Sequence, residues 1–277
     1  MIVPLNVRID PEHGGRWTSL RGGDREWLWH RHEPRRSSVL PGDAFADAGG
    51  LEECVPTVRG IPDHGDAWSR EWTRSAAEPA LTHTVQCPDF ELTRSIDVSL
   101  GSVVADYRLL AKPGFRFLWA GHALLELSQR AVLQIDQHPK TRLFPEGADS
   151  IEGEWPAPAG SRLDTLGPDD GSAIGAVISA ATTEVHDGPD RLRLTVEADG
   201  QPTSIALWRN LGGFPAESPY RSIGVEPMLG RVFDLAQADD GDCAVTPAAG
   251  EVRWRLTITA YDQKAGDVTD GYPEGAA

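Results

Sequence analysis

The chain has 277 residues and a formal net charge of −16. Nucleic acids and anionic membrane surfaces are polyanions, so this charge argues against both as partners. The three cysteines are few and widely spaced, which indicates neither a zinc site nor a disulfide framework and fits a reducing compartment. No signal-peptide pattern begins the chain, and no apolar run approaches the ~20 residues of a membrane helix. A cytoplasmic protein is expected.

Short segments with period-two alternation recur along the chain, between glycines and prolines. The alternation is clearest in 191–197, 220–230 and 253–261. Further strands are expected at 96–100, 103–110, 115–120, 131–136, 174–179 and 204–208. Only 43–54 and 123–130 resemble helices, and both are short. The pattern predicts an all-β fold, an antiparallel sandwich or barrel, without βαβ units.

Residues 1–277 are interpreted as one domain. Residues 145–171 are rich in Pro, Gly, Asp and Glu, but strands continue in the same style on both sides. A long surface loop is therefore favoured over a domain linker. The tail, 263–277, is rich in Gly and Asp and is expected to fray.

Glu226 is the first candidate for a functional residue. Read as a strand, 220–230 directs its apolar residues to one face, and Gly224 and Glu226 to the other. A carboxylate beside a residue without a side chain, on an open face, is suited to reaching a ligand. A solvated Glu at a strand end is the ordinary alternative. Pro227 cannot donate to a ladder, so it is expected to end the pairing or to lie at an edge.

A second candidate is the loop-like stretch 55–72. It is dense in side chains that form hydrogen bonds, which polyol recognition requires, because each hydroxyl needs a donor or an acceptor. These side chains are Arg59, Asp63, His64, Asp66 and Arg70. Either aspartate is placed to orient His64 and set its tautomer. A charged surface loop with local salt bridges is the alternative.

His122 is the third candidate. It closes the apolar stretch 117–122, after two small residues, Ala120 and Gly121, that leave room beside the imidazole. A buried histidine bonded to a backbone carbonyl is the alternative. The chain has no Gly-x-Ser-x-Gly elbow, so Ser-His-Asp chemistry finds no support. It has no Gly-x-Gly-x-x-Gly or Walker loop, so no nucleotide cofactor is indicated. No partner histidine lies at ligand spacing from His64, and no metal is expected.

These three stretches, in this order, resemble the aldose 1-epimerase (galactose mutarotase-like) superfamily over residues 25–262. The matching elements are Asp63-His64-Gly65 followed by a Trp, Trp119-x-x-His122, a strand ending in Glu226-Pro227, and the turn 247–251 before a closing strand. Gly121 stands where the best-known galactose mutarotases carry an Asn.

The resemblance implies a large antiparallel β-sandwich with a concave face that binds a monosaccharide without a cofactor. Glu226 would be the base and His122 the acid that interconvert the α and β anomers of an aldohexose or related sugar. The remaining residues would contact the substrate: His64, Arg59, Asp63, Arg70, Trp119 and Asn210. His64, His122 and Glu226 are expected to converge on one cleft, the last two on opposite sides of a space for one pyranose.

Two other classes of function stay open from the sequence. One is a carbohydrate-binding or sensing protein that keeps the face without turnover. The other is a glycoside hydrolase or lyase, which needs a second carboxylate about 5–9.5 Å from Glu226, and Asp63 or Asp66 would have to supply it. A phosphorylated sugar would require arginines clustered at the rim, for which the chain offers Arg35, Arg36, Arg70 and Arg74.

Overall fold

The computed structural model describes residues 1–75, 81–99, 101–146 and 149–262. Within these ranges the chain forms 21 β-strands and three short 3₁₀ helices, η1 (Pro34–Ser37), η2 (Pro158–Gly160) and η3 (Leu235–Gln237). The described part of the chain has no α-helix, which confirms the all-β prediction, and no helix there is long and apolar enough to span a membrane. The tail 263–277, expected to fray, lies outside the described residues.

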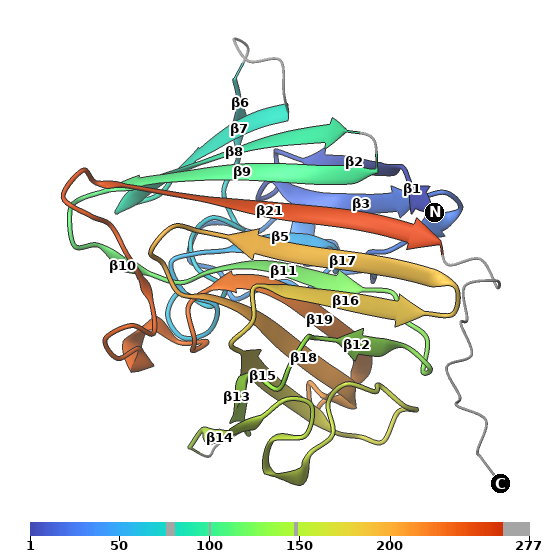
Figure 1. The fold of residues 1–277 in the computed structure, drawn as a ribbon. Helices are drawn as coiled ribbons and strands as arrows, with labels where there is room; N and C mark the ends of the chain where they lie inside the picture. The colour runs from blue at the N-terminus through green and yellow to red at the C-terminus, as the bar shows by residue number, and fades with distance from the viewer. Residues whose placement is uncertain (76–80, 100, 147–148, 263–277) are drawn as a thin grey trace, which may run out of the picture.

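Two large antiparallel sheets make up most of the fold (Figure 1). The first runs β12 (Val132–Gln134), β16 (Thr182–Asp187), β17 (Asp190–Glu197), β21 (Glu251–Asp262), β9 (Ser102–Ala111), β8 (Phe90–Ser99), β7 (Leu81–Gln86), β6 (Thr73–Arg74), with β1 (Ile2–Val3) on β21. The second runs β14 (Ile151–Glu154), β13 (Lys140–Phe144), β15 (Ala173–Ile178), β18 (Thr203–Phe214), β19 (Tyr220–Leu229), β11 (Trp119–Leu125), β5 (Leu51–Cys54), β3 (Arg16–Gly22), β2 (Leu5–Asp10), with β4 (Arg25–Glu26) on β3. A separate ribbon joins β10 (Arg116–Phe117) and β20 (Ala244–Val245).

The strands predicted from alternation fall on observed strands, although 115–120 is divided between β10 and β11. The two helical predictions are wrong. Residues 51–54 form β5 and residues 123–125 belong to β11, because each pairs with a neighbour in the second sheet. Gly49, which has a φ of 72° and lies against the Trp29 carbonyl, also opposes a helix over 43–54. The predicted loop at 145–171 contains β14 and η2, and β14 pairs with β13.

The core lies between the two sheets, and β19 shows how alternation builds it. Ile223 and Val225 pack into the main hydrophobic cluster, together with Leu192, Leu256 and Trp254 from the first sheet. Glu226 therefore faces away from this core, as the alternation predicts. Seven of the nine tryptophans are buried, namely Trp17, Trp27, Trp68, Trp72, Trp119, Trp155 and Trp254.

Pro227 lies in the interior of the sheet rather than at its edge, which corrects the expectation from sequence. It pairs with Ile205 of β18, and β19 continues to Leu229. Only the ladder to β11 is interrupted, between the pairs Ala120–Met228 and Leu124–Gly224. Proline tolerates this place because the missing donor falls where the ladder is open.

Candidate functional site

On the outer face of the second sheet, beside the interrupted ladder, the side chains of Glu226, His122 and Glu52 form a row across β19, β11 and β5. Ala206 pairs with Glu226 across β18 and β19, and His122 pairs with Glu52 across β11 and β5. The imidazole Nδ1 of His122 lies 2.8 Å from Glu226 Oε1. The two residues therefore contact each other directly, and the expectation that they face each other across a pyranose is wrong.

Gly224 makes room for the Glu226 carboxylate. A Cβ built on Gly224 would lie 2.3 Å from Glu226 Oε1 and 3.1 Å from the Cβ of Trp208. The carboxylate therefore folds back over the backbone of its own strand toward His122. Its other oxygen, Oε2, is buried and has no hydrogen-bond partner among the described residues. A ligand hydroxyl that reached this oxygen would find an acceptor whose lone pairs are uncommitted.

Gly224→Ala is expected to displace the Glu226 carboxylate and to lower any activity that depends on it by up to about 100-fold, the cost of misplacing a reacting group by about 1 Å. Gly121→Ala is the matched control, because a Cβ there meets only ordinary contacts, 3.5 Å from Trp119 and 3.8 Å from Leu256. Turnover by both variants, compared at equal folded concentration, measures the effect. Equal rates for the two variants would contradict this role of Gly224.

His64 reaches the site from the loop between β5 and β6. Its φ of 60° is rare for a residue with a Cβ and aims its ring at the second sheet. The ring centroid lies 5.1 Å from that of His122, so three sequence candidates converge. Asp63 Oδ1 lies 3.1 Å from His64 Nδ1 and 3.7 Å from Nε of Arg59, which sits at the exposed rim.

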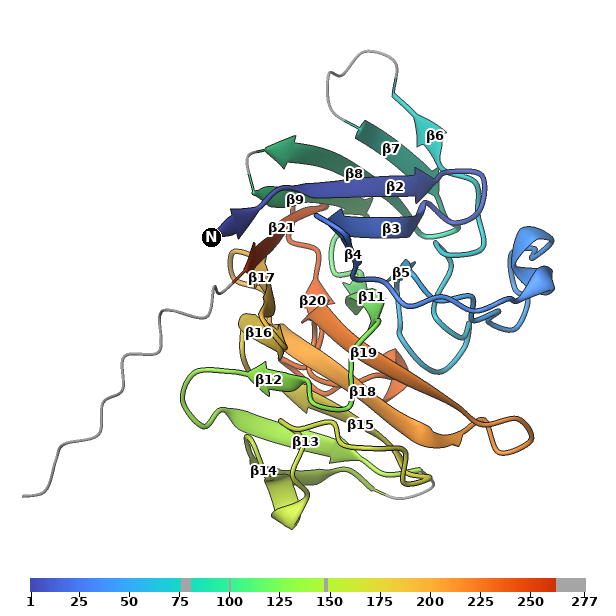
Figure 2. The ribbon, with the colours of Figure 1, turned by 90° about the vertical axis from the view of Figure 1, so that its right-hand side faces the viewer.

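Phe45 covers the two histidines, although nothing in the sequence analysis pointed to it. Its ring stacks on His64 with centroids 3.6 Å apart and planes 8° apart, and it meets His122 edge-on at 5.9 Å. Figure 2 shows its segment, between β4 and β5, on the side of the second sheet that faces away from β17 and β21. Glu226 is only 1% exposed, and each histidine 8%. The face expected to be open is therefore covered.

The surroundings shift the pKa values of the two histidines in opposite directions. Burial lowers the pKa of His122, but the contact with Glu226, helped by Asp47 and Glu52, outweighs burial and leaves this pKa above its usual value. Burial also lowers the pKa of His64, and there the bond to Asp63 does not compensate. Compared with a free imidazole, His122 thus keeps its proton to a higher pH and His64 loses its proton at a lower pH, which suits His122 to donating a proton.

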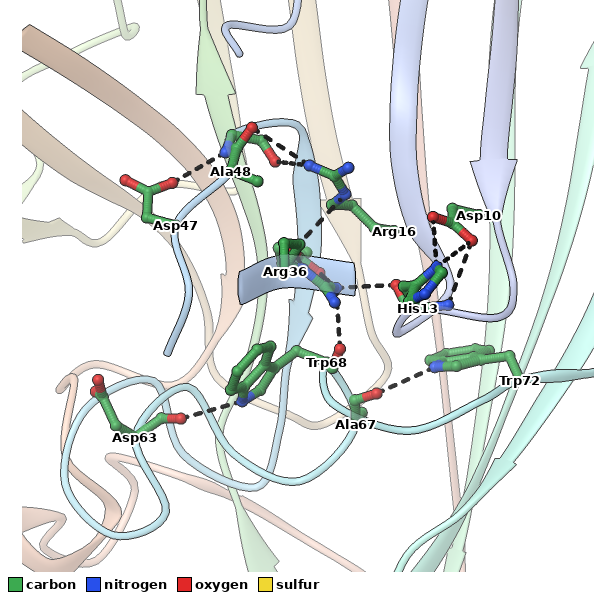
Figure 3. A network of polar contacts seen from close by, with 12 residues as sticks. Asp10, His13, Arg16, Arg36, Asp47, Ala48, Asp63, Ala67, Trp68 and Trp72 are labelled. Carbon is green, nitrogen blue, oxygen red and sulfur yellow. Dashed lines mark hydrogen bonds and ion pairs between the residues drawn. The ribbon is translucent and has the colours of Figure 1, made fainter. Parts of the chain in front are cut away.

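At the Glu52 end of the row, the Glu52 carboxylate is held by Arg36, which lies in η1. Arg36 donates to Glu52 through Nε and Nη2, at 2.8 and 2.9 Å, in a buried bidentate pair. The same guanidinium donates to the carbonyls of His13 and Trp68, at 2.8 and 3.0 Å (Figure 3). Arg36, a candidate for phosphate binding, is therefore occupied inside the protein.

Asp47 lies beside this row and secures the covering segment. Its carboxylate accepts a hydrogen bond from the hydroxyl of Tyr220 at 2.5 Å and another from the backbone N–H of Gly49 at 3.0 Å. On the other side of Glu226, Trp208 stands half-buried on the same face, opposite Gly224. Sequence analysis assigned no role to Asp47, Glu52 or Trp208. The one available signal was the adjacent pair Glu52-Glu53 within a short apolar segment.

Two expected sugar contacts have structural roles instead. Trp119 points into the core between the sheets, on the face of β11 opposite to His122, and its indole N–H donates to Glu53 at 2.7 Å. Asn210 is fully buried. Its amide N–H donates to the carbonyl of Phe214 and its oxygen accepts hydrogen bonds from the N–H groups of Gly213 and Phe214, which fixes the irregular end of β18, where the register shifts between Leu211 and Phe214. The sequence interpretation of both residues is wrong, because it did not assign them to a face or a turn.

Arg70 is another expected sugar contact. Its Nη2 lies 3.8 Å from Oδ1 of Asp66, four residues earlier in the chain. Within the part of the chain that the structure describes, neither Arg70 nor Asp66 forms a hydrogen bond or ion pair with His64, His122 or Glu226.

The arrangement resembles known structures in its fold. The chain matches a "putative aldose 1-epimerase" from Escherichia coli K12 with a TM-score of 0.71 and 12% identity, over 93% of this chain and 96% of that one. It matches a galactose mutarotase-like protein from Lactobacillus casei with a TM-score of 0.65 and 16% identity, over 93% and 97%. A galactose mutarotase related enzyme from Lactobacillus acidophilus gives 0.66 and 13%, over 94% and 95%.

No protein-family model matches the chain, and no curated protein matches it by sequence. At identities this low, the structural matches show the fold alone. The chain has the large antiparallel β-sandwich of the galactose mutarotase-like structures, which confirms the fold that the sequence resemblance implied.

Proposed function

We propose that this protein is an aldose 1-epimerase-like isomerase that interconverts the anomers of an aldohexose or a related monosaccharide. The observation that carries the proposal is the contact between His122 and Glu226, which places a carboxylate beside an imidazole whose pKa is raised. The mutarotase-like fold supports it, because the structures that share the fold include a "putative aldose 1-epimerase" and a "galactose mutarotase related enzyme".

The proposed reaction opens and recloses a hemiacetal. Glu226 Oε2 takes the proton of the O1 hydroxyl while protonated His122 gives a proton to the ring oxygen, and the bond between C1 and that oxygen breaks. The aldehyde then rotates about C1–C2 and recloses on its other face as both protons return. The charged pair becomes a neutral pair and back again, so the net charge of the row is unchanged. That conservation matters in a buried site, where an isolated charge is costly.

Two aromatic side chains would frame the sugar. Trp208 offers a partly exposed ring beside Gly224 and Glu226, and sugars stack on such faces. Phe45 lies on His64 and must shift before a pyranose can reach the row. His64, Asp63 and Arg59 would then contact the sugar hydroxyls from the loop.

Anomer exchange by NMR on freshly dissolved α-glucose and α-galactose tests the proposal directly. Exchange above the uncatalysed rate, proportional to protein concentration, is the expected result. Binding of either sugar without any acceleration would favour a carbohydrate-binding protein of the same fold instead.

Phe45→Ala is expected to expose the histidines. Ring contacts of this kind are worth about 0.5–1.5 kcal/mol, so we expect modification of His64 by diethyl pyrocarbonate to become about 2- to 10-fold faster. Because the pKa of His64 is lowered, its ring is in the neutral, reactive form near pH 7. Mass spectrometry of the peptide that contains His64 gives the rate. Leu40→Ala, in the same segment but 66% exposed, is the control and should leave the rate unchanged.

A further inference from the structure

Two carboxylates, rather than one, flank His122 in the row. Glu226 contacts the ring from β19, and Glu52 stands opposite His122 in the register of β5 and β11. Neighbouring residues of an antiparallel pair point to the same face and lie about 5 Å apart. Both carboxylates are almost completely buried. A buried imidazole between two acidic side chains is an electrostatic arrangement that packing alone does not require.

The buried pair of Glu52 with Arg36 is by itself weak evidence of a role in stability. A buried ion pair can often be replaced by apolar side chains of similar volume without loss, because desolvation offsets the attraction between the charges. Yet Arg36 is fixed by two carbonyls as well as by Glu52, and Arg16 Nε approaches Glu52 Oε1 at 3.9 Å. The carboxylate of Glu52 is thus held in one orientation beside the row.

We propose that Arg36 and Glu52 are a positioning pair for His122. Glu52 stabilises the protonated imidazole from the side opposite to Glu226. Arg36 partly neutralises Glu52, so that the imidazole can still release its proton. The use of that proton in a reaction rests on the proposed function. The effect of Glu52 and Arg36 on the pKa of His122 rests on the geometry alone.

The other charged groups around His122 do not replace this pair. Asp47 also raises the pKa of His122, but it belongs to the covering segment rather than to the sheet, and its carboxylate accepts a hydrogen bond from the Tyr220 hydroxyl. His64 approaches from the loop, but burial lowers its pKa and it supplies no negative charge; Asp63 lies 3.1 Å from His64 Nδ1. Glu226 must change its own protonation during the proposed reaction. Burial raises the pKa of Glu52 and the charge of Arg36 opposes that rise, so Arg36 favours the charged carboxylate beside His122.

The test is the pKa of His122, measured by NMR on protein labelled in its histidine rings. Glu52→Gln is expected to lower this pKa by about 0.5–1 unit, the low end of the effect of a carboxylate within 4–6 Å, because Arg36 already compensates part of it. Glu152→Gln, on β14 and 60% exposed, is the control and should leave it unchanged.

A folded Glu52→Gln protein with an unshifted His122 pKa would overturn the inference. If that variant does not fold, because Arg36 is left unpaired, the double variant Arg36→Gln/Glu52→Gln removes both charges of this buried pair. The double variant should lower the pKa of His122 by a smaller amount. An unshifted His122 pKa in the double variant would overturn the inference too. In the active enzyme, the alkaline limb of anomer exchange should move with the pKa of His122. A shifted pKa in a protein that exchanges no anomers would refute the proposed function and retain the positioning pair.

Discussion

Glu226→Gln is expected to lower the rate of anomer exchange by at least about 100-fold, the low end for one proton-transfer group. The amide keeps the shape of the side chain over Gly224 but cannot take the O1 proton. It also removes the strongest factor that raises the pKa of His122, so the proposed acid loses its proton at a lower pH. Base and acid are thus weakened together, and the alkaline limb of the pH profile should move toward acid.

NMR exchange rates and sugar affinity, measured on the same samples, separate catalysis from binding. Affinity should fall less than turnover, because Trp208, His64 and Arg59 remain. Glu152→Gln is again the matched control, since it makes the same chemical change on an exposed strand. A Glu226→Gln protein that exchanges anomers at the wild-type rate would show that Glu226 is not the base.

Glu53→Gln is expected to destabilise the fold by about 3–5 kcal/mol, the usual cost of leaving one partner of a buried ion pair uncompensated. Glu53 lies on β5 next to Glu52 but points into the core between the sheets. Its carboxylate accepts Arg94 Nη1 at 2.6 Å, the Tyr107 hydroxyl at 2.9 Å and the Trp119 indole at 2.7 Å. Neither Glu53 nor Arg94 has any exposed surface. The neutral amide would leave the Arg94 charge without a counter-ion.

Urea unfolding monitored by tryptophan fluorescence gives the change in the free energy of unfolding. Glu152→Gln should stay within about 0.5 kcal/mol of wild type, as expected for an exposed residue. A loss under about 1 kcal/mol for Glu53→Gln would mean that Arg94 is compensated by other groups. The backbone carbonyl of Gly15, 2.7 Å from Arg94 Nη2, is the available one.

The covered site also explains why its walls could not be found from sequence. Phe45 is one aromatic residue in a polar segment, and only the path of the chain from η1 to β5 brings it onto His64. Glu52 and Glu53 are adjacent in sequence, yet strand alternation sends one to the site and one to the core. The choice between them depends on which face of β5 meets the first sheet, and that is a property of the whole sandwich.

The sequence by itself determined the all-β class, the course of the main strands and the face of Glu226, because period-two alternation is local and directly readable. It also singled out His64 and His122, whose neighbours in the chain are unusual. Only the tertiary structure decided that His122 touches Glu226, that Trp119 and Asn210 serve the fold, and that Pro227 sits inside a sheet. Asn210 serves a bend formed within residues 210–214. The other placements depend on strand register between segments that are distant in the chain, and such pairing is set by the packing of both sheets rather than by any local pattern.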